Sequence, residues 1–427
     1  MATTPRISRV FGAVNIGSFR ISAMIAGQSE TGEMIVLGSG HRAAQGIKRG
    51  YVTDMAAATY AVRDAIERAE KIANTSVSSV WIGCSGAGLA SRIAEVEIDI
   101  GGRRIEEEDI TQLLVEARNS IQPDGRMVLH AQPAHYTLDG AHGVANPKGL
   151  HAERLGVDVH VMMADGAPIR NITEAVQSAH LDVEAVVGSP VAVGHACLSH
   201  EERELGVALV EFGAEVTNVS VYAAGMLLGL AAIPIGSGDI TDAIASAFGI
   251  RRFQAERLKC VAGSAIASPS DHREMIPVVG PDEEGAGQLA RHADDKNRIP
   301  RAELVSVITS ELDVLLKEVS KALKQMGFSG PRGHQIVLTG GGAELAGIAD
   351  YAQGALGKPV RIGRPPSLRG LPEAHAVPGF ATLAGLVLYA AADPVDIRSV
   401  GPRQQVIRGY SGLGLLDRFF GALKEYF

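Results

Sequence analysis

Two segments of the chain share one order of apolar stretches and tight turns. Residues 11–40 contain three apolar stretches separated by turns that carry glycine, and residues 207–238 repeat this order. Asn15 lies 196 residues before Glu211, and both segments end in Gly-Ser-Gly. Apolar stretches bounded by glycine-rich turns are typical of strands joined in hairpins. The sequence therefore predicts an internal duplication of a three-stranded unit.

A helix is predicted after each three-stranded unit. In the first copy the segment 54–73 has apolar residues at helical spacing, namely Ala58, Val62, Ala65, Ile66 and Ala69. The second copy continues into a helix at 239–248. Further short strands are predicted at 80–83, 183–187, 335–339 and 359–362, and further helices at 174–179, 344–356 and 380–392. We expect two similar α/β halves that face one another, with any ligand in the cleft between them.

Two segments lie outside this duplicated plan. Residues 85–165 predict a small α+β subdomain inserted in the first half, with a helix at 107–120. Residues 250–329 pass through a polar stretch rich in proline and glycine and end in a long helix at 301–326. The predicted organisation is a first lobe of 1–84 and 166–205, the inserted subdomain 85–165, a second lobe of 206–249 and 330–393, its insertion 250–329, a linker at 394–409 and a C-terminal helix at 410–427.

The segment 410–427 has a strongly amphipathic pattern. At helical spacing its apolar face contains Leu413, Leu416, Phe419, Phe420, Leu423 and Phe427. Such a helix docks on the protein's own core, in a groove of a partner, or in the plane of a membrane. The 16-residue linker before it argues against docking on its own core. The pattern favours the membrane, with apolar insertion as the driving force, because two basic residues are balanced by two acidic ones.

Charge and cysteine content exclude several classes of protein. The chain has 40 Lys and Arg against 48 Asp and Glu, a net charge of −8, so we expect no nucleic-acid partner held by a basic surface. Cys84, Cys197 and Cys260 lie far apart, which excludes a disulfide framework or a local zinc knuckle and fits a reducing cytoplasm. The five histidines from His130 to His160 lack metal-ligand spacing, and we interpret them as surface and turn residues.

No secretory signal and no transmembrane helix are predicted. The uncharged stretch 216–238 contains several polar and glycine residues and alternates, which indicates two paired strands rather than a spanning helix. The segment 380–392 is apolar on all sides, which is typical of a helix buried in a protein core.

Four longer segments carry a family resemblance. They read QPAHYTLDG at 132–140, VVGSPVAVGHACLSHEERELGV at 186–207, IPIGSGDITDAIASAFGI at 233–250 and IVLTGGGAELAGI at 336–348. Together with the duplication and the amphipathic tail, this ordered series resembles the FtsA family of actin-like bacterial cell-division proteins over nearly the whole chain.

The resemblance implies an actin-like fold, which is a duplicated RNase H-like fold of two lobes, with 85–165 as the subdomain characteristic of the family. It implies an adaptor that anchors filaments of the tubulin-like protein FtsZ to the cytoplasmic face of the inner membrane at the septum. The implied partners are the C-terminal peptide of FtsZ, further copies of the chain in a head-to-tail polymer, membrane lipid and other division proteins. Arg301 falls at the family's basic position for the FtsZ peptide, and Arg298 lies close by.

The family also implies a cleft for ATP with Mg²⁺, and here the sequence departs from the pattern. Gly17, Ser18, Arg20, Gly213 and the triplet Gly340, Gly341 and Gly342 fit the phosphate and adenosine turns. The usual phosphate-loop aspartates are replaced by Asn15, Glu211 and Ala243. Asp242 stands one residue early, which points its carboxylate elsewhere on a helix, and Phe19 replaces a small residue. These changes leave ATP binding open and argue against efficient hydrolysis, so we expect no enzyme or at most a weak ATPase.

Two other functions remain open from the residues alone. The first is an actin-fold ATPase or kinase-like enzyme, which requires the missing carboxylates and leaves the amphipathic tail unexplained. The second is a related actin-like scaffold of a pilus or secretion apparatus, which requires a different inserted subdomain.

Overall fold

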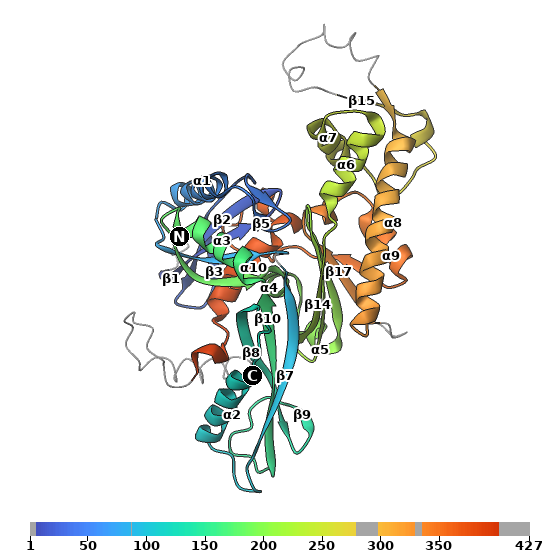
Figure 1. Cartoon of the computed structure of the whole chain (residues 1–427). Helices are drawn as coiled ribbons and strands as arrows, with labels where there is room; N and C mark the ends of the chain where they lie inside the picture. Colours follow the sequence, from blue (N-terminus) through green and yellow to red (C-terminus); the bar gives the residue numbers. More distant parts are fainter. Residues whose placement is uncertain (1–5, 87, 279–297, 329–334, 401–427) are drawn as a thin grey trace.

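Two five-stranded sheets form the two lobes of the molecule (Figure 1). The computed structural model describes residues 6–86, 88–278, 298–328 and 335–400. The strands of the first sheet are β1 (Ile7–Ile16), β2 (Arg20–Ser29), β3 (Met34–Ala43), β6 (Ser79–Cys84) and β11 (Asp182–Gly188). Those of the second are β12 (Val207–Phe212), β13 (Thr217–Ala223), β14 (Met226–Ile233), β17 (Gln335–Thr339) and β18 (Val360–Ile362).

The two sheets have equivalent strand orders, β3-β2-β1-β6-β11 and β14-β13-β12-β17-β18. In both, three antiparallel strands are continued by two parallel ones. The hairpins also share their register, because Asn15 pairs with Ser22 and Glu211 pairs with Asn218. The duplication predicted from the sequence is therefore confirmed, as is the hairpin predicted in the uncharged stretch 216–238.

Helices cover both lobes. Those on the first lobe are α1 (Met55–Ala73), α3 (Gly166–Gln177), α4 (Ser189–Cys197) and α10 (Ala381–Ala392). The second lobe carries α5 (His200–Leu205), α6 (Ser237–Phe248), α7 (Arg252–Ala262), α8 (Arg301–Gln325) and α9 (Ile348–Leu356). The apolar faces predicted for α1 and α8 are buried. Helix α1 begins at Asp54, whose side chain accepts a hydrogen bond from the Ala57 backbone N–H, and ends at Asn74 in the left-handed region.

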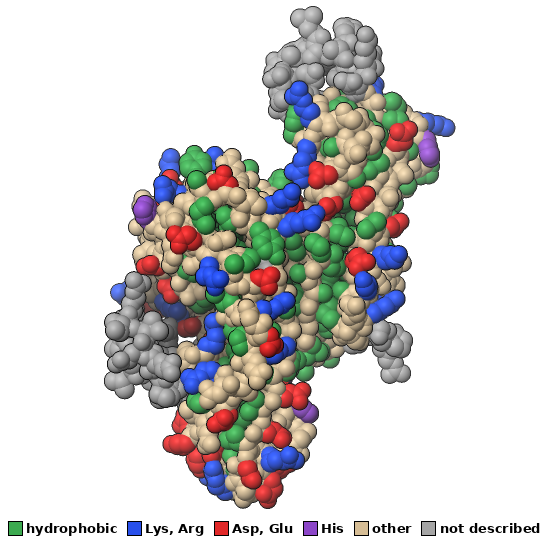
Figure 2. Space-filling model, viewed as in Figure 1, with side chains coloured by type: hydrophobic (Ala, Val, Ile, Leu, Met, Phe, Trp, Pro, Cys, Tyr) green, Lys and Arg blue, Asp and Glu red, His purple; other side chains and the backbone are tan. Residues whose placement is uncertain are grey.

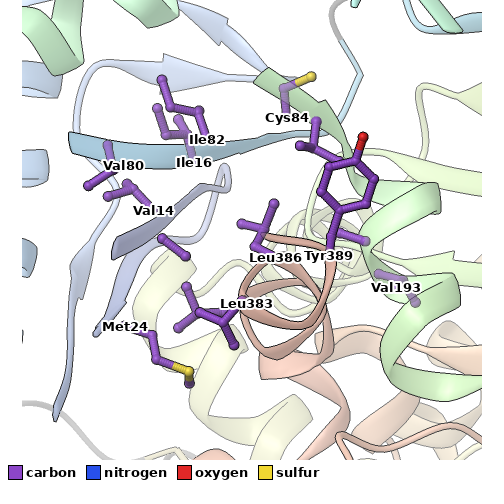
Figure 3. Packing of buried hydrophobic residues seen from close by; sticks show 14 of the residues in the cluster. Val14, Ile16, Met24, Val80, Ile82, Cys84, Val193, Leu383, Leu386 and Tyr389 are labelled. Carbon is purple, nitrogen blue, oxygen red and sulfur yellow. The ribbon is translucent and has the colours of Figure 1, made fainter. Parts of the chain in front are cut away.

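Helices α4 and α10 pack closely beside the first sheet. Leu383, Leu386 and Tyr389 of α10 lie among apolar side chains of β1, β2 and β6 (Figure 3). A Cβ atom on Gly385 would lie 1.9 Å from the carbonyl oxygen of Ala192 in α4. Only glycine at position 385 lets the two helices approach this closely.

The inserted subdomain has its own sheet and core below the two lobes in Figure 1. Its strands are β7 (Ala90–Asp99), β8 (Met127–Leu138), β9 (Ala141–Val144) and β10 (Arg154–Ala164), in the order β7-β10-β8-β9, and its helix is α2 (Glu107–Ser120). Figure 2 shows acidic side chains gathered on the end of this subdomain that lies away from the lobes.

The start of the predicted linker 394–409 is packed rather than free. Ile397 is fully buried in the core of the inserted subdomain, and Arg398 donates a hydrogen bond to the backbone carbonyl of Val128 in β8. A guanidinium N–H of Arg118 in α2 also donates to the carbonyl of Val400. The interpretation of 394–400 as a linker is therefore wrong. The burial of Ile397 and these two hydrogen bonds hold the segment against the inserted subdomain. Residues 401–427 lie outside the described residues.

Two of the five clustered histidines are buried, which corrects the interpretation that all are surface and turn residues. His130 and His160 lie on β8 and β10 with their ring centroids 6.1 Å apart. Burial lowers the pKa of His130 well below its usual range and that of His160 to about 4, so both rings are neutral at pH 7. In the described part of the chain no group of three or more His, Cys, Asp or Glu side chains could hold a metal ion.

Among the described residues one segment, Pro378–Ser399, is long and apolar enough to span a membrane by length and composition. It contains α10 and is mostly buried inside the molecule, as expected for a core helix.

The close contact between α4 and α10 gives a stability prediction. Gly385→Ala is expected to lower the free energy of unfolding by about 2 kcal/mol, because the new methyl group must push two helices apart. Gly354→Ala in α9 is the matched control: no atom lies within 4 Å of its added Cβ, and we expect a gain of about 0.5 kcal/mol from helix propensity. Denaturant unfolding measures both, and equal stability of the two variants would contradict the close helix crossing.

Candidate functional site

A cavity of about 440 Å³ lies between the two lobes. Its walls are the β1–β2 turn, the β12–β13 turn, the glycine triplet after β17, and residues of α7. The structure brings together every residue predicted for the nucleotide site, namely Gly17, Ser18, Arg20, Gly213, Gly340, Gly341 and Gly342. The duplicated hairpins thus place equivalent turns on opposite sides of one cavity.

The two hairpin turns are closed by their own backbone. The Gly17 N–H donates to the carbonyl of Arg20, and the Gly213 N–H donates to the carbonyl of Val216. A Cβ atom at either glycine would lie within 3 Å of the same carbonyl oxygen. Glycine is thus required here by the turn itself, so these two glycines alone do not indicate a bound phosphate.

The glycine triplet divides into two structural positions and one that faces open space. Gly340 has a φ of +85°, and a Cβ there would lie 2.5 Å from the carbonyl oxygen of Phe212. A Cβ on Gly342 would lie 2.4 Å from the Phe212 ring. Nothing lies within 4 Å of a Cβ on Gly341, which lines the cavity. Gly341 is therefore the position where a side chain would reduce the space for a ligand without straining the fold.

The carboxylate of Glu211 is held entirely by neighbouring side chains. Its Oε2 accepts hydrogen bonds from the Ser189 hydroxyl at 2.6 Å and from the Asn218 amide at 2.9 Å. Its Oε1 accepts one from the Thr382 hydroxyl at 2.6 Å. Glu211 is only 8% exposed. One carboxylate thus joins β12, β13 and the first turns of α4 and α10: it lines the cavity, and each of its oxygens accepts at least one hydrogen bond from the protein.

Other acidic side chains near the cavity also have protein partners. Asp242 does not line the cavity, as its one-residue shift predicts. Its carboxylate instead forms an ion pair with Arg252 of α7 at 2.6 Å. Glu215 accepts a hydrogen bond from the backbone N–H of Arg49, which belongs to the other lobe. Asn15 lines the cavity without a charge, and Ala243 does not line it. Glu344, an exposed residue of the cavity wall, accepts a hydrogen bond from the Gly379 N–H. Each of these described carboxylates has a protein partner, so they do not fit a Mg²⁺ site built on unpartnered carboxylates.

Cationic side chains do face the cavity. The Arg20 guanidinium lies 3.8 Å from the centroid of the Phe380 ring, and burial lowers its pKa although Glu344 opposes this shift. Lys259 of α7 is buried, donates to the Thr241 hydroxyl and pairs with Glu256 at 2.8 Å. Burial raises the pKa of Glu256, but Lys259 and neighbouring donors outweigh it and lower the pKa overall. The half-buried Arg20 suits an anionic ligand, whereas the charge of Lys259 is already balanced by Glu256.

The sequence reasoning missed Glu256, Lys259 and Thr382. Glu256 and Lys259 stand three residues apart on a helix, which is the spacing of an ordinary surface ion pair. Thr382 stands in an otherwise apolar helix, and a threonine there gives no signal of its partner 171 residues away.

Two residues of the β1–β2 turn were considered in the sequence analysis. Ser18 accepts a hydrogen bond from the Gly50 N–H, and Phe19 is 58% exposed and lines the cavity.

The residues predicted for peptide binding lie away from this cavity. Arg298 is exposed in β16 (Arg298–Pro300), which pairs with β15 (Met275–Pro277), and Arg301 begins α8. The Arg301 guanidinium pairs with Glu274 at 2.8 Å and with Asp271 at 3.4 Å. Its positive charge is thus already balanced within the chain. The predicted membrane residues of 410–427 lie outside the described residues.

The Glu211 contacts give a second stability prediction. Glu211→Ala removes the carboxylate acceptor of the Ser189 and Thr382 hydroxyls, while the Asn218 amide keeps its hydrogen bonds to Ser85 and Ser189, so we expect a loss of about 3 kcal/mol in the free energy of unfolding. Glu211→Gln keeps one acceptor and is expected to lose about 1 kcal/mol. The exposed Glu184→Ala in β11 is the control and should change little. Denaturant unfolding that shows no loss for Glu211→Ala would refute this role.

The comparisons with known proteins follow the same division of the chain. The family model for "Cell division protein FtsA" matches residues 208–385, and the model for the "SHS2 domain inserted in FTSA" matches residues 86–163. The cell division protein FtsA of Agrobacterium fabrum is 33% identical over 432 residues, which covers 98% of this chain and 95% of that protein. FtsA of Escherichia coli K12 is 29% identical, over 88% of this chain and 89% of its own length.

Solved structures of low sequence identity share the fold. A PilM–PilN type IV pilus biogenesis complex matches with a TM-score of 0.60 and 17% identity, over 89% of this chain and 98% of that one. MreB5 of Spiroplasma citri bound to ADP matches with a TM-score of 0.51 and 11% identity, over 90% and 96%. At these identities the likeness shows the fold alone, and it confirms the predicted actin-like architecture. The chain as a whole belongs to the FtsA family of actin-like cell-division proteins.

Proposed function

We propose that this protein is a non-enzymatic adaptor that couples FtsZ filaments to the cytoplasmic face of the inner membrane at the septum. The observation that supports the non-enzymatic part is the Glu211 carboxylate, which already accepts hydrogen bonds from Ser189, Asn218 and Thr382. An actin-fold ATPase or kinase needs a carboxylate that holds a metal or its water. Family membership supports the role in cell division.

The competing scaffold of a pilus or secretion apparatus has less support. The solved structure with the PilM–PilN title shares the fold at 17% identity. The inserted subdomain matches the type found in FtsA, over residues 86–163, and the full-length relatives are cell division proteins. We therefore retain the division adaptor.

ATP is proposed as a static ligand of the cavity between the lobes, without resident Mg²⁺. Arg20 supplies positive charge, and Gly341 leaves space for close approach. A nucleotide bound there would contact both lobes and hold them together. It would act on assembly through shape, since the described carboxylates that line the cavity already accept protein hydrogen bonds. Self-assembly head to tail, as the family implies, would then multiply weak membrane contacts.

The proposed FtsZ site lies at the start of α8. Arg301 holds two carboxylates there, Glu274 and Asp271. An acidic peptide that binds Arg301 must compete with these internal partners, which predicts modest affinity for a single site. Many such sites along two filaments would still bind firmly by effective concentration.

Charge variants at this site test the peptide proposal. Arg301→Glu is expected to weaken binding of the FtsZ C-terminal peptide by about tenfold or more, since a cation becomes an anion. Glu274→Gln is expected to have the opposite effect. It removes one of the two carboxylates that pair with Arg301 and should strengthen binding of the peptide a few-fold. Fluorescence anisotropy with a labelled peptide measures both. Unchanged affinity in both variants would place the peptide elsewhere.

The amphipathic tail supplies the proposed membrane anchor. Removal of 410–427 is expected to move the protein from the floated to the soluble fraction in flotation with phosphatidylethanolamine–phosphatidylglycerol vesicles. In the full chain Phe420→Asp should act likewise because it places a charge on the apolar face. Lys424→Gln, on the polar face, is the control and should still float. Flotation of the truncated chain would reject this anchor.

A further inference from the structure

A second cavity, of about 490 Å³, lies where the inserted subdomain meets both lobes. Its walls come from β8 and β10 of the inserted subdomain, from α4 and α5, and from the β13–β14 turn (Figure 1). The packed segment that contains Pro394 and Val395 closes one side. This cavity shares no lining residue with the cavity between the lobes. None of the functions proposed above involves it.

The contacts around this cavity fix its walls. His135 of β8 hydrogen bonds to the carbonyl of Ala224 in the β13–β14 turn, and the next residue, Gly225, donates its N–H to the carbonyl of Arg203. The Tyr222 hydroxyl donates to the carbonyl of Pro190 in α4 at 2.9 Å. The cavity is thus built from elements that are held to one another, as expected of a preformed small-molecule site.

Buried polar groups without partners stand in these walls. His160 is 4% exposed and lines the cavity, and its Nε2 has no hydrogen-bond partner among the described residues. Burial also lowers the pKa of His195, on α4, to about 4, so His160 and His195 present neutral rings at pH 7. Unpaired buried polar atoms are costly, and a ligand or trapped water would satisfy them.

One cation faces the cavity with its charge unbalanced. Arg203 of α5 has a buried guanidinium Nε without a hydrogen-bond partner in the described part of the chain. Its charge lowers the pKa of His195 in addition to the effect of burial. The neighbouring carboxylate, Glu204, lies 3.9 Å from His200. No ion pair between Arg203 and a described carboxylate is present.

We propose that this cavity binds a small amphipathic organic anion, with its acidic group against Arg203 and its apolar body against Val191 and Leu227. A free guanidinium favours a carboxylate, sulfonate or phosphate over a neutral group. The apolar wall is continued by Met226, Pro394 and Val395. The neutral His160 and His195 rings supply hydrogen bonds that do not repel an anion.

A matched pair of dyes tests the charge requirement. Anilinonaphthalene sulfonate is an amphipathic anion, and N-phenylnaphthylamine is the same aromatic body without the sulfonate. In fluorescence titrations of the full chain, Arg203→Ala is expected to weaken sulfonate binding by about tenfold and to leave the neutral dye within about twofold. Arg203→Lys should retain most of the sulfonate affinity. Arg170→Ala, at an exposed arginine of α3, is the control.

Hydrogen exchange of the unaltered protein locates the site without any variant. The sulfonate dye is expected to slow exchange at 132–136 and 222–227, the backbone on two sides of the cavity. Ala134→Phe, which fills the cavity, should abolish binding of both dyes. Protection confined to 15–20 and 256–263, loss of the signal in excess ATP, or equal sulfonate affinity of Arg203→Ala and wild type would each overturn the proposal.

Discussion

The buried carboxylate of Glu211 holds together the elements on which the two lobes depend. It accepts hydrogen bonds from α4, β13 and α10, and the two helices touch each other where Gly385 meets Ala192. Burying a carboxyl group is costly unless hydrogen-bond donors surround it, and here three side chains donate to it. Glu211, which the family resemblance places where a phosphate-loop aspartate is expected, is thus bonded to three side chains of this chain.

This arrangement separates binding from chemistry in the cavity between the lobes. The duplicated turns, the open position at Gly341 and the cation Arg20 remain suited to a nucleotide. Asp242 stands one residue before the position where the family resemblance leads us to expect an aspartate, and it pairs with Arg252. These features are the basis of the proposal that a nucleotide acts here as a static ligand.

The sequence predicted the elements whose pattern is local, and it failed where contacts are distant. The hairpin repeat, the buried faces of α1 and α8 and the core helix α10 follow from periodicity within each segment. The burial of Ile397 depends on a subdomain far away in the chain. His130 and His160 are buried because two strands pair, and the partners of Glu211 come from three separate elements. No periodicity within one segment encodes these contacts.

Calorimetric titration of the tail-less protein with ATP, in Mg²⁺ and then in excess chelator, tests the central claim most directly. Because the Glu211 carboxylate is bonded to protein donors and is not expected to hold Mg²⁺, the affinity of the protein for ATP should agree within about threefold in the two conditions. Phosphate release, followed in the same samples, should stay near the rate without protein. Binding that requires Mg²⁺, or rapid release of phosphate, would contradict an actin-like scaffold whose cleft carries no metal site.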